Sequence, residues 1–553
     1  MPDLTVDKKY KLLAFLFISF ISLIVFYPSF FHVTRADQTI FLIETADFKG
    51  LGELFSYSYS YCRTRVIYTG DQFLFRPGFY LLLSLEKWLF GYNFFLWQVT
   101  GYILHVLLLW RLFRILYFLR AGIFAVLAAL NFGVLFISQE MVIWHHINGY
   151  ILALIFILLA LEQFLYYLKE GQAPPKRLWA MIGWLTLACF TCEFGLVCSL
   201  VLLMAAWIHR KYFLKNKLAG SLSEDKAAKY INHPLLLSLP VIVYSYVSFL
   251  DYALRNLKPA AAGTSFDFGV LTVHFLNILK MALIAPFVPI FLPIQPEQRT
   301  FLYSLNMKDI LAQYSSASWA ANLNAVLVVL ALVFTFTAII QFHRKNTGMA
   351  EKERNVYFVF GAASLTCALG YIFMTVIGRL ADRQLFYMLQ SLYHFYTIIL
   401  FLWIAVFAFG CLFVENKKFL KSLLLTVLIG SIFLNAFQSY RFNLYTRGLY
   451  APWREMMVEI DNFVEKHKNE KDFSMNILWR DLWSPMVFNL GSPITGEEKR
   501  GYLLDFLYRN HINFENPKYY LVYFNDSGLQ VFENKEKAQA LIDSKKSKHV
   551  TTP

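Results

Sequence analysis

Ionisable residues that could carry out chemistry gather at a few places in an otherwise apolar chain. They combine carboxylates, arginines and a histidine, and they are Asp37, Asp47, Arg76, His146, Glu193, Arg379 and Arg383. A carboxylate can take the proton from an attacking hydroxyl group. An arginine can hold a phosphate whose negative charge grows as a bond to it breaks. Residues of these types beside a membrane would suit transfer of a sugar from a lipid phosphate.

Each of these residues also has a structural interpretation. Asp37 can be a solvated loop acid, and Glu193 can mark the tip of a helical hairpin. Arg379 and Arg383 can pair with Asp382. Histidines such as His146 more often satisfy local hydrogen bonds than bind a metal. The sequence has no Cys/His spacing typical of a metal site, no P-loop and no GxGxxG after a strand. We therefore expect no nucleotide, no other cofactor and no obligatory metal, and the sequence leaves a divalent metal open.

The elements that position these residues must be membrane helices. The 553 residues are 58% hydrophobic and only 16% charged, whereas soluble domains are about 45–50% apolar and about 25% charged. The 55 Phe and 33 Tyr exceed what a soluble chain of this size could bury. Soluble, disordered, coiled-coil and disulfide-stapled classes are excluded. The net charge of +14 is then explained by basic cytoplasmic loops and not by nucleic acid.

A membrane core about 30 Å thick requires roughly 20 apolar residues per helix. Eleven spans are predicted, near 11–27, 94–113, 121–138, 147–167, 178–191, 194–208, 234–250, 319–342, 357–377, 391–413 and 422–438. Basic residues fall on one side of this arrangement, which the positive-inside rule makes the cytoplasm. The N-terminus is then cytoplasmic and the C-terminus external.

Two further apolar stretches are predicted not to cross the membrane. Segment 74–91 begins with Arg76-Pro77 and contains Glu86-Lys87, which is typical of a helix at the outer interface. Segment 271–293 has Lys280 in its middle and several prolines near its end, which favours a re-entrant or interfacial piece. A crossing by either one would place basic clusters on the wrong side.

The composition divides the chain into two domains. Residues 1–438 form the transmembrane domain, whose first external loop is 28–93. Residues 439–553 are charged and mixed, and predict a small soluble α+β domain outside the membrane. Within it, 453–467 predicts a helix, 519–533 predicts two strands joined by a turn, and the tail from Lys545 is expected to be disordered.

Four ordered segments resemble glycosyltransferases of the GT-C fold that use polyprenyl-phosphate sugars, in their protein O-mannosyltransferase-like branch. The segments are FRPGFYLLLSLEKWLFGYNFFLWQVTGYILHVLLLWRLFRILYFLR (75–120), QEMVIWHHINGYILALIFILL (139–159), CEFGLVCSLVLLM (192–204) and ADRQLFYMLQ (381–390). The chain departs from that pattern in several places. Asp37 is followed by Gln38 where many relatives have a second acid, and Asn148-Gly149-Tyr150 replaces a charged turn. Cys192 replaces a lysine before Glu193.

The resemblance implies an all-α GT-C-like membrane fold with a catalytic acid in the first external loop, just after the first span. Asp37 occupies that place, and Asp47 is the runner-up in the same loop. Arg383, with Arg379 second, would hold the donor phosphate. Arg76, His146 and Glu193 would shape the same cavity.

We therefore expect an enzyme that moves a sugar, as a hexosyl group, from a polyprenyl-phosphate donor to an acceptor hydroxyl on the external face. The expected displacement is inverting, and the expected location is the inner membrane of a bacterium. The alternatives are a flippase or transporter for a lipid-linked saccharide, or a structural protein whose C-terminal domain recruits partners. The sequence leaves open whether the acceptor is protein, lipid or polysaccharide.

Overall fold

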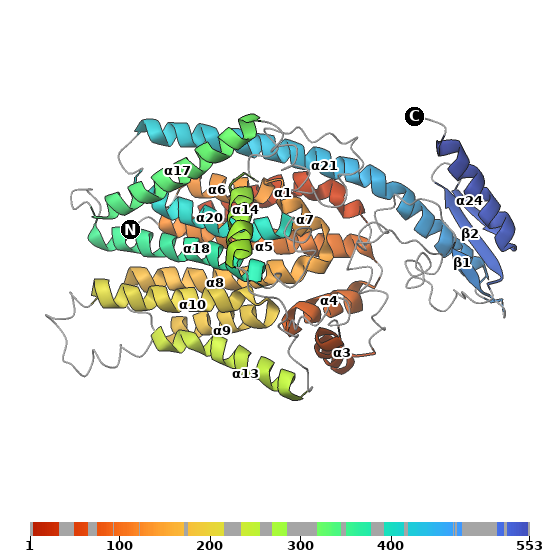
Figure 1. The fold of residues 1–553 in the computed structure, drawn as a ribbon, viewed down its shortest axis with the longest axis horizontal. Coiled ribbons are helices and arrows are strands. Elements are labelled where there is room, and N and C mark those ends of the chain that lie inside the picture. The colour runs from red at the N-terminus through yellow and green to blue at the C-terminus, as the bar shows by residue number, and fades with distance from the viewer. Residues whose placement is uncertain are drawn as a thin grey trace.

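The computed structural model consists of a helical bundle joined by one long helix to a small sheet (Figure 1). It describes residues 4–32, 49–64, 75–91, 93–120, 122–170, 175–214, 234–254, 268–284, 318–343, 350–377, 392–413, 418–467, 469–470, 473–477, 517–524 and 528–550.

Most α-helices of the bundle follow the predicted apolar segments, whereas α3 lies in the predicted first external loop, at 51–64, where no helix was expected. The α-helices are α1 (Leu4–Phe26), α3 (Leu51–Thr64), α4 (Pro77–Phe90), α5 (Phe94–Leu119), α6 (Ile123–Val134), α7 (Ser138–Ile143), α8 (Asn148–Glu170), α9 (Pro175–Thr191), α10 (Phe194–Ile208), α13 (Leu239–Leu254), α14 (Phe268–Ile284), α17 (Ser318–His343), α18 (Glu351–Ile377), α20 (Leu392–Cys411) and α21 (Lys418–His467). Short helices of other types are η1 (Tyr27–Phe31), η3 (His145–Ile147), η4 (His209–Leu214) and η5 (Pro234–Ser238).

Each of the eleven predicted spans coincides with a helix, but fewer helices have the length and composition to cross a membrane. Seven described segments do: Lys8–Phe31, Phe94–Leu119, His145–Lys169, Phe194–Lys211, Glu351–Val376, His394–Cys411 and Lys421–Gly448. The other four predicted spans correspond to α6, α9, α13 and α17, which do not meet that length and composition over their described residues. α6 illustrates the reason, since its 12 residues extend only about 18 Å.

Helix α4 corresponds to the predicted interfacial segment 74–91. Its 14 residues extend about 21 Å, which is less than the roughly 30 Å of a membrane core. α4 begins at Pro77, and proline is favoured at the first helical position because its missing N–H has no partner there in any case. Figure 1 shows α3 and α4 at the end of the bundle that faces the strands, opposite the N-terminus. The same view shows α14, which covers the whole described part of 271–293, lying across the bundle.

Polar residues inside the bundle are mostly used to join helices. The buried His105 on α5 has Nδ1 3.0 Å from the Tyr396 hydroxyl on α20 and Nε2 3.0 Å from the Gly133 carbonyl on α6. Nearer the C-terminal end of α5, Arg114 lies 2.5 Å from the Glu162 carboxylate on α8. These contacts fix α5 at the centre of the core, where Trp97 and Leu112 are fully buried.

The C-terminal region contains a three-stranded sheet in the order β1 (Met475–Ile477), β2 (Tyr519–Phe524), β3 (Gly528–Phe532). β2 and β3 are antiparallel, as expected from 519–533, whereas the parallel strand β1 was not predicted. The helix α24 (Lys535–Val550) packs on β2 through Ala538 and Ile542. The expectation of a disordered tail from Lys545 is wrong, because α24 continues to Val550.

The change in composition at 438/439 falls inside α21, which runs unbroken for 50 residues. Its final turns reach the sheet, where a Glu459 carboxylate oxygen accepts the Leu529 N–H of β3 at 2.6 Å. The transmembrane and C-terminal parts of the chain therefore share one helix, and no linker separates them at that position.

Candidate functional site

The site is built around Arg76, the residue directly before α4. Arg76 is the N-cap of α4, and its neighbour Phe75 is held in place by the Tyr244 hydroxyl of α13, which donates to the Phe75 carbonyl at 3.0 Å. The rings of Phe75, Phe190 and Tyr244 pack together with centroids 5.6–6.0 Å apart. Contacts with α9 and α13 therefore fix the backbone at Arg76 independently of the contacts that the Arg76 side chain makes.

Glu193 lies at the turn between α9 and α10, as the sequence predicted for a hairpin tip. The turn is tight, because a Cβ on Gly195 would lie 2.4 Å from the Cys189 backbone nitrogen. Only glycine allows the two helices to approach this closely. The hairpin therefore delivers the Glu193 carboxylate to the end of the bundle where α4 begins.

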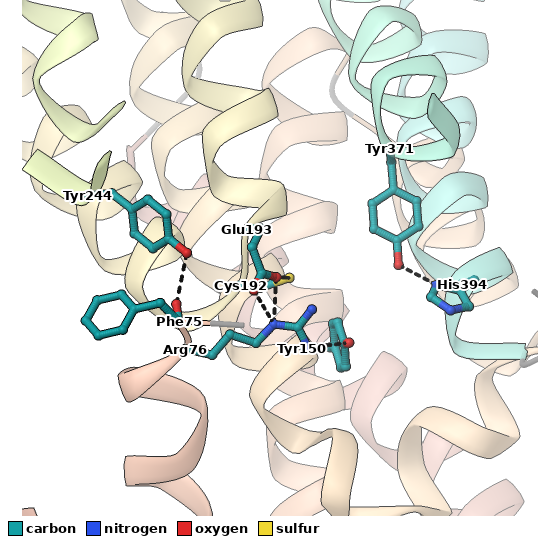
Figure 2. A network of polar contacts seen from close by, with 8 residues as sticks. All are labelled: Phe75, Arg76, Tyr150, Cys192, Glu193, Tyr244, Tyr371 and His394. Atoms are coloured by element: carbon teal, nitrogen blue, oxygen red, sulfur yellow. Dashed lines mark hydrogen bonds and ion pairs between the residues drawn. The ribbon is translucent and has the colours of Figure 1, made fainter. Parts of the chain in front are cut away.

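The Arg76 guanidinium is clamped between an acid and a phenol (Figure 2). Its Nε donates to both carboxylate oxygens of Glu193, at 2.7 and 2.6 Å, and its Nη1 donates to the Tyr150 hydroxyl at 2.7 Å. The Cys192 thiol lies 4.0 Å from a Glu193 oxygen. The side chains of Arg76 and Glu193 are 16% and 18% exposed, so the pair remains accessible from outside the protein.

The charge of Arg76 is secured by its surroundings. Burial alone would lower the pKa of the guanidinium, but the opposing effects of Glu193, Tyr150, Cys192 and Tyr80 raise that pKa well above its usual value. Arg76 is therefore a permanent, oriented cation. Such a group can bind a phosphate or stabilise negative charge as it develops during a reaction.

A second polar contact joins α4 to the start of α8. The Asn148 amide donates to Glu86 Oε1 at 2.7 Å, and both residues are buried. Glu86 Oε2 has no hydrogen-bond partner among the described residues. Burial raises the pKa of Glu86 to about 8, although the Asn148 hydrogen bond lowers it. The Arg76–Tyr150 hydrogen bond attaches the start of α4 to the first turn of α8, and the Glu86–Asn148 hydrogen bond attaches the second half of α4 to the same turn.

His146 lies on the same side of the bundle and contacts this site through aromatic rings. Its ring is 5.6 Å from that of Phe79 on α4 and 6.2 Å from that of Trp144. The Phe79 ring also lies 5.4 Å from that of Tyr150. Within the described part of the chain, no three His, Cys, Asp or Glu residues are grouped so that they could hold a metal ion.

The helices that flank 378–391 converge on the same hairpin. The Phe194 ring, next to Glu193, lies 4.8 Å from the Tyr371 ring near the end of α18. The Tyr371 hydroxyl is 2.8 Å from Nδ1 of His394, at the start of α20 (Figure 2). Arg379 and Arg383 belong to the segment between these two helices and lie outside the described residues, as do Asp37 and Asp47.

The structure therefore joins Arg76 directly to Glu193. His146 packs on the ring of Phe79, which in turn packs on Tyr150, the second hydrogen-bond partner of Arg76. The sequence analysis missed Tyr150, Tyr244, Tyr371 and His394 as contributors. A signal for Tyr150 was present, because it lies in the turn where the resembling proteins carry charged residues. The sequence showed that the turn Asn148-Gly149-Tyr150 carries no charge. The structure adds that the Tyr150 hydroxyl in this turn contacts Arg76.

These features define a polytopic, helical membrane protein with a small α+β C-terminal part. No protein-family model matches the sequence, and no curated protein matches it. Among solved structures, ArnT from Cupriavidus metallidurans bound to undecaprenyl phosphate matches with a TM-score of 0.40 and 11% identity, over 93% of each chain. The apo state of the same ArnT matches with a TM-score of 0.32 and 12% identity, over 94% of each chain.

Proposed function

We propose that the chain is an integral-membrane glycosyltransferase of the GT-C class. It moves a sugar, as a hexosyl group, from a polyprenyl-phosphate donor to an acceptor hydroxyl on the external side of the membrane. The observation that carries this proposal is the clamped guanidinium of Arg76, which lies at the end of the bundle between Glu193 and Tyr150. A fixed cation at the membrane edge matches the charge of a lipid phosphate.

The proposed reaction is a single inverting displacement. The acceptor oxygen attacks the anomeric carbon of the sugar while Asp37 takes the proton of the acceptor hydroxyl. The bond between the anomeric carbon and the phosphate oxygen breaks, and its electron pair leaves with the polyprenyl phosphate. Asp47 is the runner-up base. Arg383, with Arg379 second, holds the phosphate as its charge grows.

Arg76, Glu193 and His146 are proposed to bind and orient the donor. Glu193 and Tyr150 restrict the guanidinium to one orientation, so little ordering remains to be done when the donor binds. Phosphate is already a good leaving group, so neither a metal nor a nucleotide is required. A donor anchored in lipid also explains why the polar residues lie at the end of the bundle.

The proposed location is a bacterial inner membrane with the N-terminus in the cytoplasm. Figure 1 supports opposite sides for the two ends of the chain, because the N-terminus and the C-terminal strands lie at opposite ends of the bundle. The proposed acceptor is a molecule that offers a hydroxyl group.

The test is transfer from a synthetic polyprenyl-phosphate hexose by protein reconstituted in liposomes. Asp37→Asn should reduce the transfer rate by roughly 10²–10⁴-fold, which is the contribution of a general base. Asp47→Asn distinguishes the runner-up, and Asp71→Asn is the matched control in the same loop. Unchanged transfer by correctly folded Asp37→Asn and Asp47→Asn proteins would exclude this mechanism. Movement of the intact donor across the bilayer without chemical conversion would instead identify a flippase.

A further inference from the structure

Two arginines at the end of the transmembrane part of α21 share one aromatic ring. The guanidinium carbon of Arg447 lies 4.1 Å from the ring centroid of Phe31, and that of Arg454 lies 5.3 Å from it. The two arginines are seven residues apart, which places them on the same face of a helix. Both distances are within the roughly 6 Å range of a cation–π interaction.

This pair lies on a rigid support. The Asn443 amide of α21 donates to the Val25 carbonyl of α1 at 2.8 Å, and the Thr446 hydroxyl is 2.9 Å from Nε2 of His32. Asn443, Thr446 and His32 are all buried. The helix that carries the arginines is therefore fixed against the element that carries Phe31.

Both guanidinium groups lie close to one aromatic ring, and the positive charge of Arg447 acts on Arg454. Neither Arg447 nor Arg454 forms an ion pair with a carboxylate in the part of the chain that the structure describes, and the buried Nε of Arg454 has no hydrogen-bond partner among the same residues. Burial and the neighbouring charge of Arg447 lower the pKa of Arg454, and Glu455 opposes this effect. An anion bound near the two guanidinium groups would offset this repulsion.

The surroundings indicate which kind of anion is available. The candidate span in α21 runs from Lys421 to Gly448, so Arg447 lies at its end and Arg454 lies about 9 Å beyond, at 1.5 Å per residue. Large apolar side chains on the same helix, including Val427, Phe433 and Leu444, are exposed, and only 11% of the span is buried. This helix therefore faces lipid up to the level of the arginine pair, which is the level of lipid headgroups.

We infer that Arg447, Arg454 and Phe31 form a binding site for the phosphate of a membrane lipid. Each guanidinium can donate two parallel hydrogen bonds to phosphate oxygens, and the Phe31 ring holds both groups in position. The site uses α21 and η1, whereas the Arg76 cluster uses α4, α8 and the turn between α9 and α10. It is thus a second phosphate site, and it goes beyond the proposed function.

The test measures lipid binding to the full-length protein by native mass spectrometry and by thermal stabilisation in detergent. The probes are phosphatidylglycerol, as a bilayer lipid, and polyprenyl phosphate. The double variant R447Q/R454Q should bind the preferred lipid roughly 30-fold more weakly, since each arginine near an anionic headgroup contributes about fivefold. Phe31→Leu keeps both charges and should weaken binding about 2- to 5-fold, which is the contribution of an exposed cation–π contact.

Arg441→Gln is the matched control. Arg441 is on the same helix and lies 5.6 Å from the exposed ring of Phe437, but it does not contact Phe31. A loss confined to R447Q/R454Q and Phe31→Leu supports the site, and the lipid that responds identifies the source of the phosphate. Equal weakening by Arg441→Gln, or unchanged binding of both lipids by R447Q/R454Q, would overturn the inference. Since Phe31→Leu leaves both arginines in place, it also tests the site if the double variant folds poorly.

Discussion

The Nε atom of Arg76 lies within 2.7 Å of both carboxylate oxygens of Glu193, although the two residues are 117 positions apart in the chain. This pair connects the start of α4 to the turn between α9 and α10. Because both side chains are mostly buried, each depends on the other for its hydrogen bonds and for compensation of its charge.

Breaking this pair should destabilise the protein. In either Arg76→Gln or Glu193→Gln, the remaining charge loses its partner, and we expect the free energy of unfolding to fall by about 1–3 kcal/mol. The double variant R76Q/E193Q should lose less than the sum of the two single variants, because it leaves no unpaired charge. Unfolding in detergent measures all three proteins. Strictly additive losses would show that the two side chains do not interact in solution.

Tyr150→Phe should impair function more than stability. The change removes the hydroxyl that accepts from Arg76 Nη1 at 2.7 Å and leaves the aromatic packing intact. If Arg76 orients the donor phosphate, kcat/KM for sugar transfer should fall by about tenfold, equivalent to about 1.4 kcal/mol. Tyr246→Phe is the control, because Tyr246 is 62% exposed on α13. Equal activity of the two variants would remove Tyr150 from the site.

Gly149→Ala should separate α4 from α8. A Cβ at position 149 would lie 2.2 Å from a carbon of the Phe79 ring, so the ring or the helix must move. Overpacking of this kind costs about 1–3 kcal/mol. Gly183→Ala is the matched change within a helix, since no atom lies within 4 Å of a Cβ at position 183. It should be neutral or stabilise the protein by up to about 1 kcal/mol. Thermal unfolding of the two variants gives the comparison directly.

Glu86 should make stability depend on pH. Burial raises the pKa of Glu86 from 4.5 to about 8, so the folded protein keeps a proton that the unfolded chain releases. Stability should then fall as the pH rises from about 4.5 towards about 8, by at most about 1.4 kcal/mol per pH unit. Glu86→Gln keeps an acceptor for Asn148 and cannot titrate, so this decline should be absent.

Unfolding midpoints of the wild type and Glu86→Gln, measured between about pH 5 and about pH 9, test this linkage. The advantage of the variant should widen with rising pH and then level off once the wild-type carboxyl is charged in both states. Parallel curves for the two proteins would mean that Glu86 is ionised in the folded state throughout this range.

The helical architecture could be predicted because apolar length is a local property of the sequence. The hairpin at Glu193 was predicted because basic residues, Lys176-Arg177 and Arg210-Lys211, flank the two apolar spans 178–191 and 194–208 on their outer sides. The short helix at 74–91 was predicted from its charges. It was harder to predict which apolar segments form helices long enough to cross a membrane. The helix α6, for example, ends after 12 residues even though the apolar composition continues beyond it. The long helix α21 crosses a change in composition that was interpreted as a boundary. Helical hydrogen bonds continue through such a change, so composition alone does not locate the end of a helix.

Partners within the site could be predicted only in part. Arg76, His146 and Glu193 were selected because charges and histidines are rare in an apolar chain. Tyr150 was not selected, because tyrosine is common here and is usually interpreted as part of an interfacial belt. The contact between Arg76 and Glu193 depends on the packing of α4 against α9, over a sequence separation that no local pattern encodes.

The continuity of α21 holds the C-terminal sheet at a fixed distance from the apolar part of the same helix. At 1.5 Å per residue its 50 residues extend roughly 75 Å, more than twice the roughly 30 Å thickness of a membrane core. Because Glu459 attaches β3 to this helix, a tilt or rotation of its transmembrane part would move the sheet as well. The sheet therefore keeps a set distance from the transmembrane part of α21, whereas a flexible linker would allow this distance to vary.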